Sequence, residues 1–434
     1  MEESAILGQG RLVTTPADPG AVGHLPGTPA YRRIVTALFA AGVATFALLY
    51  STQALLPALS EEFGVSSAQS ALTLSLTTLG LGFALLVAGP ASDMFGRTRM
   101  IHLSLTTAAG VALACALAPS WPTLLALRFL EGVALAGLPA VATAYLREEL
   151  HPSTHSRVAG LYIGGTALGG MAGRLVTGPV GELAGWRWAL ATVALLGLGC
   201  AVVVRVTLPG SRHFTPAPTG VRSLLEMFGR AVRDPGLLAL YGIGGCVAGA
   251  LVAVFNTLGF RLVGAPFHLG LAAASLVFLV YPVGTASAAG FGRLADRYGR
   301  RAVLPLGCLL AACGALLTLP RWLPVVVIGL GLLTAGFFAV HGVASGWVPA
   351  RAHAGGATAG QAASLYLFTY YLGSSVFGTL AGRAWSTTGW PGVVALATVL
   401  LAVAAALALR LQRTPTLTER GIGEDAPTGG STVM

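Results

Sequence analysis

Two ionisable residues, Arg128 and Glu131, lie three positions apart within an otherwise apolar stretch of the chain. On a helix this spacing places both side chains on one face, where a guanidinium and a carboxylate pair. Burial penalises the charged carboxylate and the neighbouring guanidinium stabilises it, and these opposing effects are what a reversible proton carrier requires. The pattern therefore indicates proton coupling through Glu131, or else a fixed ion pair that ties two helices together.

The composition around this pair is that of a membrane protein. Of the 434 residues, 55% are hydrophobic and 10% are charged, and the mean hydropathy is +0.76, whereas soluble domains carry about 25% charged residues. A soluble globular fold is therefore excluded. The five cysteines lie in apolar runs, without a CxxC pair or a histidine at metal-ligand spacing. We expect them to be buried small side chains, and we expect no metal site.

Helices that cross about 30 Å of hydrocarbon need about 17 to 25 residues. Ten uncharged runs are long enough, and two further apolar segments carry Arg128 and Glu131, or Arg174, in their middle. Because backbone groups cannot stay unsatisfied in lipid, both segments are predicted to be helices whose charges face protein or water. The sequence thus predicts twelve spans, at residues 34–60, 63–92, 100–127, 122–146, 158–179, 188–204, 235–260, 262–292, 302–320, 322–350, 352–382 and 384–409.

The basic residues, all 26 of them arginines, are distributed unevenly between the two sides of this arrangement. Twenty fall in loops and tails on one side, two lie inside spans, and four lie on the other side: Arg187, Arg261, Arg321 and Arg383. Arginine-rich loops stay in the cytoplasm, so we expect both termini there, in a bacterial-type cytoplasmic membrane. Topology accounts for the net charge of +10, and no nucleic-acid partner is expected.

The chain repeats itself with a period of about 204 residues. Gly185-Trp186, for example, recurs as Gly389-Trp390. Each half holds six predicted spans, so both halves enter the membrane in the same direction. We expect two bundles, at 32–207 and 235–410, joined by a cytoplasmic linker at 208–234 with a short helix near 223–230, and disordered cytoplasmic tails at 1–31 and 411–434.

One repeated segment is a polar loop motif, whose glycines permit a tight turn and whose acid can face the positive N-terminus of a neighbouring helix. It resembles the GxxxDxxGR signature of the major facilitator superfamily. This resemblance implies an all-α polytopic membrane fold of about twelve helices in two six-helix bundles. In that family the motif locks the cytoplasmic side of the outward-facing state; the alternative is that its arginines only fix orientation. The expected gating residues are Gly89, Asp93, Gly96 and Arg97, and Gly292, Asp296, Arg297, Gly299 and Arg300.

The two copies of this motif differ at one position, where the first has Met94 and the second has Arg297. We therefore expect the first copy to make one fewer ionic contact than the second, which would make the lock asymmetric.

Further segments resemble the same family. Residues 128–132 are similar to its RxxQG motif with an acid in place of the amide, and Glu131 is the only carboxylate inside any predicted span. The glycine-rich segment 160–174 resembles the fifth-helix motif of the antiporters, but it has Gly165-Thr166 where exporters carry Gly-Pro. Tight static packing is the alternative for these glycines.

Three segments of the second half, 255–261, 336–347 and 360–375, together with the glycine-rich segment, resemble the YnfM-type efflux permeases, which are close to the drug:proton antiporters.

The resemblance also implies which residues face the substrate, since in this superfamily the first helix of each three-helix unit lines a central cavity. Phe338, His341 and Ser345 share one helical stripe. Packing is the alternative role for His341, and an interhelical hydrogen bond for Asn256; Tyr366, Tyr370 and Tyr371 either stack on cargo or anchor their helix. Besides Arg128 and Glu131, the expected cavity residues are Tyr50, Gln53, Arg174, Asn256, Phe338, His341, Ser345 and Tyr370.

Together these features predict a secondary active transporter that exports a small amphiphilic solute or drug in exchange for protons by alternating access. The alternative is uncoupled or proton-coupled uptake of a sugar or another small metabolite. With no GxxxxGK[ST] loop, no lysine and no convergent catalytic groups, neither a nucleotide-driven pump nor an enzyme is expected. We expect no cofactor beyond the proton gradient, a small-molecule substrate, a surrounding bilayer and a functional monomer.

Overall fold

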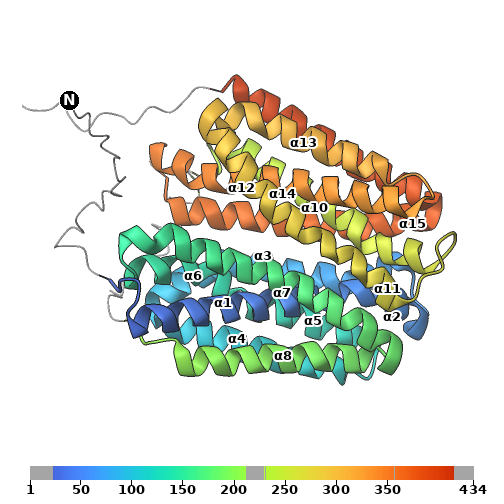
Figure 1. Ribbon diagram of the computed structural model, residues 1–434, viewed down its shortest axis with the longest axis horizontal. Coiled ribbons are helices and arrows are strands. Elements are labelled where there is room, and N and C mark those ends of the chain that lie inside the picture. Colours follow the sequence, from blue (N-terminus) through green and yellow to red (C-terminus); the bar gives the residue numbers. More distant parts are fainter. Residues whose placement is uncertain (1–22, 212–228, 230, 356, 415–434) are drawn as a thin grey trace, which may run out of the picture.

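The fold consists of long helices arranged in two bundles (Figure 1). The computed structural model describes residues 23–211, 229, 231–355 and 357–414. Most of the predicted linker helix and most of both predicted tails lie outside the described residues. Within that range the secondary structure is helical, apart from one isolated β-bridge between His24 and Leu150.

The N-terminal half comprises α1 (Pro29–Tyr50), η1 (Gln53–Leu55), α2 (Leu56–Phe63), α3 (Ser67–Phe95), α4 (Arg97–Ala116), α5 (Trp121–Leu135), α6 (Gly137–Glu149), η2 (Pro152–Thr154), α7 (His155–Ala184) and α8 (Trp186–Thr207). The C-terminal half comprises α10 (Pro235–Val263), α11 (Leu271–Ser275), η3 (Leu276–Val280), α12 (Tyr281–Tyr298), α13 (Arg300–Leu317), α14 (Leu323–Ala354) and α15 (Ala359–Gln412).

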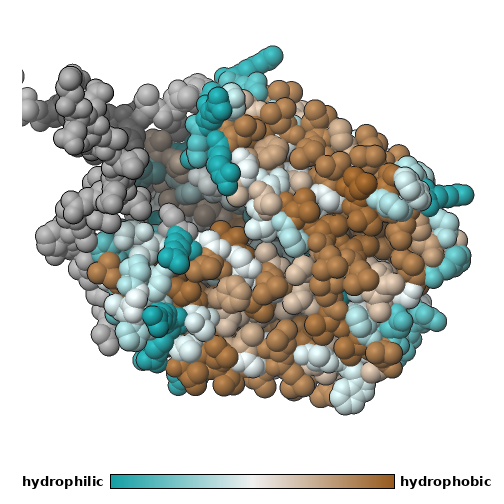
Figure 2. All heavy atoms as spheres, in the orientation of Figure 1, coloured by the Kyte–Doolittle hydropathy of each residue, from teal (hydrophilic) through white to brown (hydrophobic). Residues whose placement is uncertain are grey.

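Ten helical segments in the described part of the chain are long and apolar enough to cross a membrane. The longest, α15, forms two spans, because Gly389 has non-helical dihedral angles (φ 67°, ψ −156°) at its kink. Helix α7 has 30 residues but contains eight glycines, which lower its hydropathy. With α7 included and α15 divided, twelve helical spans correspond to the twelve predicted ones. Two predicted ranges are too long, because 100–127 runs through the turn after α4 into α5 and 262–292 includes the non-helical residues 264–270. Figure 2 shows the apolar side chains in a broad band between more polar ends.

Two predicted boundaries are wrong because a charge was taken as the end of a span. Helix α10 continues past Arg261 to Val263, since the Arg261 guanidinium donates to the carbonyls of Thr318 and Pro320. Likewise, the helix that was expected to end before Arg383 continues as far as Gly389. An arginine whose donors are satisfied inside the protein does not have to end a membrane helix.

The two halves have equivalent packing. In the N-terminal half α1 packs against α7 and α3 against α5, and in the C-terminal half α10 packs against α15 and α12 against α14. Gln53 and Asn256, which are 203 residues apart, hydrogen-bond to each other at 2.7 Å. Equivalent positions of the repeat therefore meet between the bundles, as expected for halves related by an axis along the membrane normal.

Because the halves run in the same direction, the two loop motifs lie at one end of the molecule, here called the motif end. Gly96 joins α3 to α4 and Gly299 joins α12 to α13, with φ of 93° and 86°. Glycine adopts such positive φ values without steric strain. The other end of the bundles, where α2 and α11 lie, is called the opposite end.

Helix α7 packs on α1 through glycines at backbone-to-backbone distance. A Cβ atom added at Gly169 would lie 2.2 Å from the carbonyl oxygen of Val43, and one added at Gly173 would lie 2.5 Å from that of Ala47. These glycines hold two helices in close contact, which agrees with the packing alternative for this segment.

We expect Gly169→Ala to lower the thermal unfolding midpoint of the detergent-purified protein, because the added methyl group meets a backbone oxygen. Overpacking of this kind costs about 1–3 kcal/mol. Gly164→Ala on the same helix is the matched control, since a Cβ there has no neighbour within 4 Å. Equal midpoints for the two variants would contradict the close contact.

Candidate functional site

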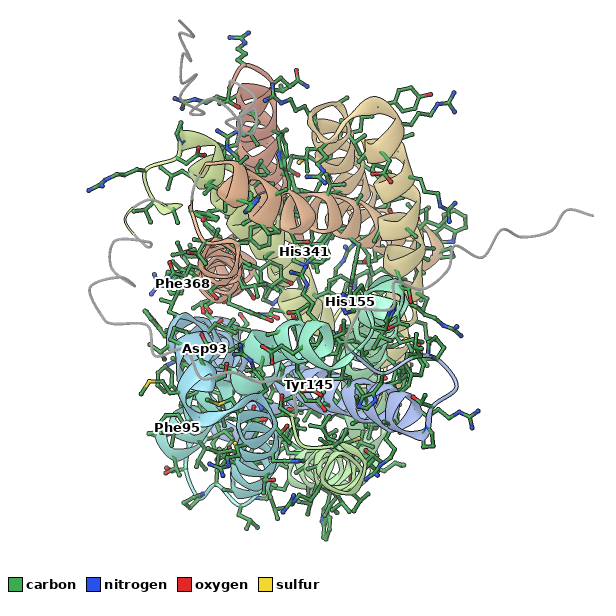
Figure 3. The ribbon with its side chains drawn as sticks, turned by 90° about the vertical axis from the view of Figure 1, so that its left-hand side faces the viewer. Asp93, Phe95, Tyr145, His155, His341 and Phe368 are labelled. Atoms are coloured by element: carbon green, nitrogen blue, oxygen red, sulfur yellow. The ribbon has the colours of Figure 1, made fainter. Side chains whose placement is uncertain are left out.

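The first copy of the loop motif forms an ionic cluster. Arg97 pairs with Asp93 at 2.5 Å and with Glu148 of α6 at 3.0 Å, and it donates to the hydroxyl of Ser92. The cluster ties the α3–α4 turn to the end of α6, so it lies entirely within the N-terminal half. Figure 3 shows Asp93 on that bundle, viewed from the motif end.

The second copy is open by comparison. Asp296, Arg297 and Arg300 are exposed, and among the described residues none of them forms an ion pair. The expectation that the first copy makes fewer ionic contacts is therefore wrong. The additional partner in the first copy is Glu148, which lies outside the motif, so a comparison of the two motifs alone does not reveal it. The equivalent position of the second half, near the end of α14, is occupied by Arg351.

Arg128 and Glu131 form a buried ion pair inside the N-terminal bundle. Their side chains are 1% and 0% exposed, and Arg128 Nη1 lies 2.6 Å from Glu131 Oε2. The same carboxylate oxygen accepts from Cys115 Sγ of α4 at 3.6 Å, whereas Glu131 Oε1 has no partner among the described residues. The contacts of this pair all lie within the N-terminal half, so it takes no part in the bonding between the bundles, and its place at the central cavity stays a prediction.

Arg128 also satisfies the break between α1 and η1. Its guanidinium donates to the carbonyls of Leu48 and Leu49, to the hydroxyl of Ser51 and, across to α3, to the carbonyl of Thr73. Carbonyls at the end of a helix lack an intrahelical donor, and lipid supplies none. The arginine thus allows the first span to bend inside the membrane.

A second buried arginine, Arg174 of α7, lies between the two halves. Its Nε donates to Gln53 Oε1 at 2.5 Å and its Nη1 donates to the carbonyl of Gly170 at 2.7 Å. Gln53 in turn donates to Asn256 Oδ1 of the C-terminal half. The three side chains, each 1–2% exposed, form a hydrogen-bonded chain that crosses from one bundle to the other.

The Arg174 guanidinium is enclosed by aromatic rings. Its Cζ lies 4.0 Å from the ring centroid of Tyr50, 4.6 Å from that of Tyr281 and 4.9 Å from that of Phe278. Cation–π attraction offsets part of the cost of burying this charge. No carboxylate of the described residues pairs with it, which distinguishes it from Arg128.

Further rings continue from Arg174 into the C-terminal bundle. Tyr281 contacts Phe338 edge-on at 6.2 Å between centroids, and His341 stacks on Phe337 at 5.7 Å. His341 Nδ1 lies 3.0 Å from the hydroxyl of Tyr366, and its ring lies 5.0 Å from that of Tyr370. Figure 3 shows His341 near the boundary between the bundles.

Hydrogen bonds join the two halves between this site and the opposite end of the molecule; this region is called the closed side. The hydroxyls of Ser75 and Thr379 lie 2.9 Å apart, and Glu182 accepts from the backbone N–H of Ala272 at 2.8 Å. Toward the motif end the halves also meet, through Tyr50 and Tyr370, whose side chains hydrogen-bond, and through the rings of Phe83 and Phe368, whose centroids lie 5.2 Å apart. Further bonds across the closed side are Ser67 to the Gly382 carbonyl, at 3.0 Å, and Thr78 to Ser375, at 2.7 Å.

A small pocket lies on this closed side, next to Gln53 of the hydrogen-bonded chain. Gln53 and Phe278 line it, together with mostly aliphatic residues of η1, α10, α11 and η3.

Comparison with known proteins identifies the family. The Major Facilitator Superfamily model matches residues 37–289. The chain belongs to this superfamily. An uncharacterized MFS-type transporter of Bacillus subtilis, YybF, is 43% identical over 379 residues, covering 87% of this chain and 93% of the relative. The inner membrane transport protein YnfM of Escherichia coli is 42% identical over 387 residues, covering 89% and 92% of the two chains. The predicted YnfM-type resemblance is thus confirmed.

A solved structure supports the fold of this transporter. A bacterial homolog of the human lysosomal transporter Spinster, in an inward-facing and occupied conformation, superposes with a TM-score of 0.72 over 89% of this chain and 98% of the other. At 16% identity the likeness shows the fold alone. The predicted all-α polytopic architecture is confirmed, and the chain is a multi-pass membrane transporter.

Most of the predicted cavity residues of the transporter come together, although sequence spacing alone does not connect them. Tyr50, Gln53, Arg174 and Asn256 meet directly, and Tyr281 links them to the stripe on α14. Ser345 stands apart, since its hydroxyl bonds only to the carbonyl of Gly342. The packing alternative for His341 and the hydrogen-bonding alternative for Asn256 agree with their contacts.

Two residues of the site were missed. Phe278 and Tyr281 lie where the short 3-10 helix η3 passes into α12, and both rings cover Arg174. Aromatic residues within a long apolar run do not by themselves indicate contact with a buried arginine. The local signal is Pro282, which favours the first turn of a helix at that point.

We expect Arg128→Lys to destabilise the transporter by about 2 kcal/mol or more, because an ammonium cannot reach the carbonyls of both α1 and α3. Glu131→Gln is the milder change, since the amide oxygen still accepts from Arg128. Chemical unfolding in mixed detergent micelles measures both. A larger loss for Glu131→Gln than for Arg128→Lys would show that the ion pair, and not the capped helix break, stabilises this region.

Proposed function

We propose that this transporter exports a small amphiphilic solute in exchange for protons, by alternating access to a site around Arg174, Gln53 and Asn256. The observation that supports it is the uneven hydrogen bonding between the halves. Most of the hydrogen bonds between the bundles, such as that of Ser67 to the Gly382 carbonyl, lie between the site and the opposite end, whereas toward the motif end the bundles meet mainly through aromatic rings. Such an arrangement is one of the two states that an alternating-access cycle requires.

The motif end is proposed to face the cytoplasm. The arginine-rich loops that join α3 to α4 and α12 to α13 lie there, and such loops are retained on the cytoplasmic side. The conformation described is then inward-facing. A solute would reach the ring cluster of Tyr281, Phe338 and His341 from the cytoplasm.

The bonds across the closed side are suited to reversible opening. They are single hydrogen bonds between neutral hydroxyls and amides, together with the Glu182 contact to the backbone, and a typical bond of this kind contributes about 1 kcal/mol. The ion pairs of the described residues, in contrast, lie within one half. Each bundle can therefore move as a body while the contacts between bundles exchange.

Glu131 is the proposed proton carrier. It is buried in the middle of a span, and its Oε1 atom has no hydrogen-bond partner among the described residues, so protonation there breaks no existing bond. Arg128 connects the carboxylate to the break after α1, one turn before Gln53. A change in the charge of Glu131 would thus act on the helix that carries Gln53 to the site.

Export is proposed on the similarity to YnfM-type efflux permeases. Uptake of a sugar or another small metabolite is the alternative, and the direction of solute movement under an imposed proton gradient distinguishes the two. A panel of drugs, sugars and amino acids, tested for solute-induced proton movement in vesicles of known orientation, supplies that measurement.

Cross-linking tests alternating access without a known cargo. In a background without native cysteines, we expect the pair Ser75→Cys and Thr379→Cys to form a disulfide that holds the opposite end closed. A third cysteine at Ser345, labelled after cross-linking, is expected to react with impermeant maleimide from the motif end and not from the other side. Reduction should restore labelling from both sides, whereas two-sided labelling of the cross-linked protein would exclude the mechanism.

Replacement of Glu131 tests the coupling. We expect Glu131→Gln to abolish transport driven by a proton gradient while solute exchange without a gradient persists, because the amide cannot release a proton. Glu62→Gln is the control, since this acid is half exposed and pairs with Arg187 at the opposite end. Unchanged gradient-driven transport in Glu131→Gln would remove this residue as the carrier.

A further inference from the structure

Arg174 differs from the other strongly buried arginines of the described chain in what neutralises it. Arg128 has the carboxylate of Glu131, and Arg351 has that of Asp234 at 2.7 Å. Arg261 lacks a carboxylate but donates to three carbonyls at the end of α13. Arg174, although 1% exposed and placed between the halves, has one amide oxygen, one carbonyl and three rings.

One edge of the Arg174 guanidinium has a donor without an acceptor among the described residues. Nη1 is held by the carbonyl of Gly170, Nε by the neutral oxygen of Gln53, and Nη2 donates to no described residue. The Nε and Nη2 donors together match the two oxygens of a carboxylate, which binds arginine through two parallel hydrogen bonds. A buried charge without a counter-ion is costly, and a ligand that supplies the negative charge recovers part of that cost.

We propose that Arg174 binds the carboxylate of an aromatic monoanion. This inference rests on the proposed function, since it names the class of solute for the same site. The carboxylate takes the place of Gln53 Oε1 on Nε and also engages Nη2. The aromatic body of the solute lies against the rings of Tyr50 and Tyr281, which contact Arg174, and of Phe338, which contacts Tyr281.

The charge of the site favours an anion over the other classes of solute. An organic cation would be placed beside a buried guanidinium, with no carboxylate among the described residues of the site to compensate. A neutral solute would leave the guanidinium in its present state, with only a neutral acceptor. Of the three classes, only an anion supplies what the buried arginine lacks.

Binding at Arg174 also has a consequence for the contact between the halves. Gln53 holds Arg174 through its oxygen and Asn256 through its nitrogen, so an anion that displaces the oxygen frees Gln53 to turn away from Asn256. The amide nitrogen of Asn256 has no partner of its own in the described structure. Occupation of Arg174 therefore weakens one of the bonds that close the opposite end.

The test compares three probes of the same shape: 2-naphthoate, its neutral amide 2-naphthamide, and the cation 2-naphthylmethylammonium. Calorimetric titration of the detergent-purified full chain gives the affinities. We expect 2-naphthoate to bind at least about tenfold more tightly than either of the others, because a charge-assisted pair replaces a neutral hydrogen bond.

Variants assign this preference to the guanidinium. Arg174→Gln is expected to remove the preference for the anion, and Arg174→Lys to reduce it, whereas Arg187→Gln at the opposite end leaves it intact. Gln53→Glu places a carboxylate next to Arg174 within the protein itself. We expect this variant to stay folded, to unfold at a higher temperature than the wild type without ligand, and to lose binding of 2-naphthoate.

Equal binding of the anion and the amide, absence of binding by all three probes, or retention of the preference in both Arg174→Gln and Gln53→Glu would overturn the proposal.

Failure of the proposed alternating access is distinguished from failure of the proposed solute class by combining binding with cross-linking. If Arg174 binds the anion but the Ser75–Thr379 cross-link leaves two-sided labelling unchanged, the site stands and alternating access does not. If cross-linking acts as expected but the anion is not preferred, only the class of solute is wrong.

Discussion

Hydrocarbon offers no hydrogen-bond partners, so each polar group that the chain carries into the membrane must find its partner within the protein. Three buried arginines illustrate three solutions. Arg128 is satisfied by a carboxylate and by carbonyls at a helix break, and Arg261 by the carbonyls at the end of α13. Arg174 has only neutral acceptors and rings. The first two fix the shape of a bundle, and the third leaves a charge to be met by a ligand.

The same constraint separates what is rigid from what moves. Ionic pairs, which are costly to break when buried, hold each half together, as at Arg128–Glu131 and at Asp234–Arg351. The contacts between the halves are mostly neutral hydrogen bonds from serine, threonine, glutamine and asparagine side chains, with the Glu182 contact to a backbone N–H as the exception. This distribution suits two bodies that change their relative orientation without losing their own packing.

The internal repeat explains where the site lies, between the two halves, but not which side chains form it. Gln53 and Asn256 are equivalent residues of the two halves, and they meet where the halves adjoin. Arg174, however, has Gly378 at the equivalent position, and a Cβ there would already lie 2.9 Å from the Asn256 amide nitrogen. One half therefore supplies the charge, and at the equivalent position the other half has a glycine that lies against Asn256. A symmetric fold with an asymmetric centre lets a single solute bind between two similar bundles.

The sequence by itself determined the helical membrane architecture, the parallel repeat, the loop motifs and most of the residue types at the site, because hydrophobicity and periodicity are local properties of the chain. It did not determine which charges face the boundary between the halves. Arg128 and Arg174 are both arginines within apolar spans, yet one caps a helix break inside a bundle and the other lies between bundles. The rings of Phe278 and Tyr281, and the Glu148 partner of Arg97, also come from distant helices. Only the tertiary structure decides these contacts, since they depend on which helix faces pack together.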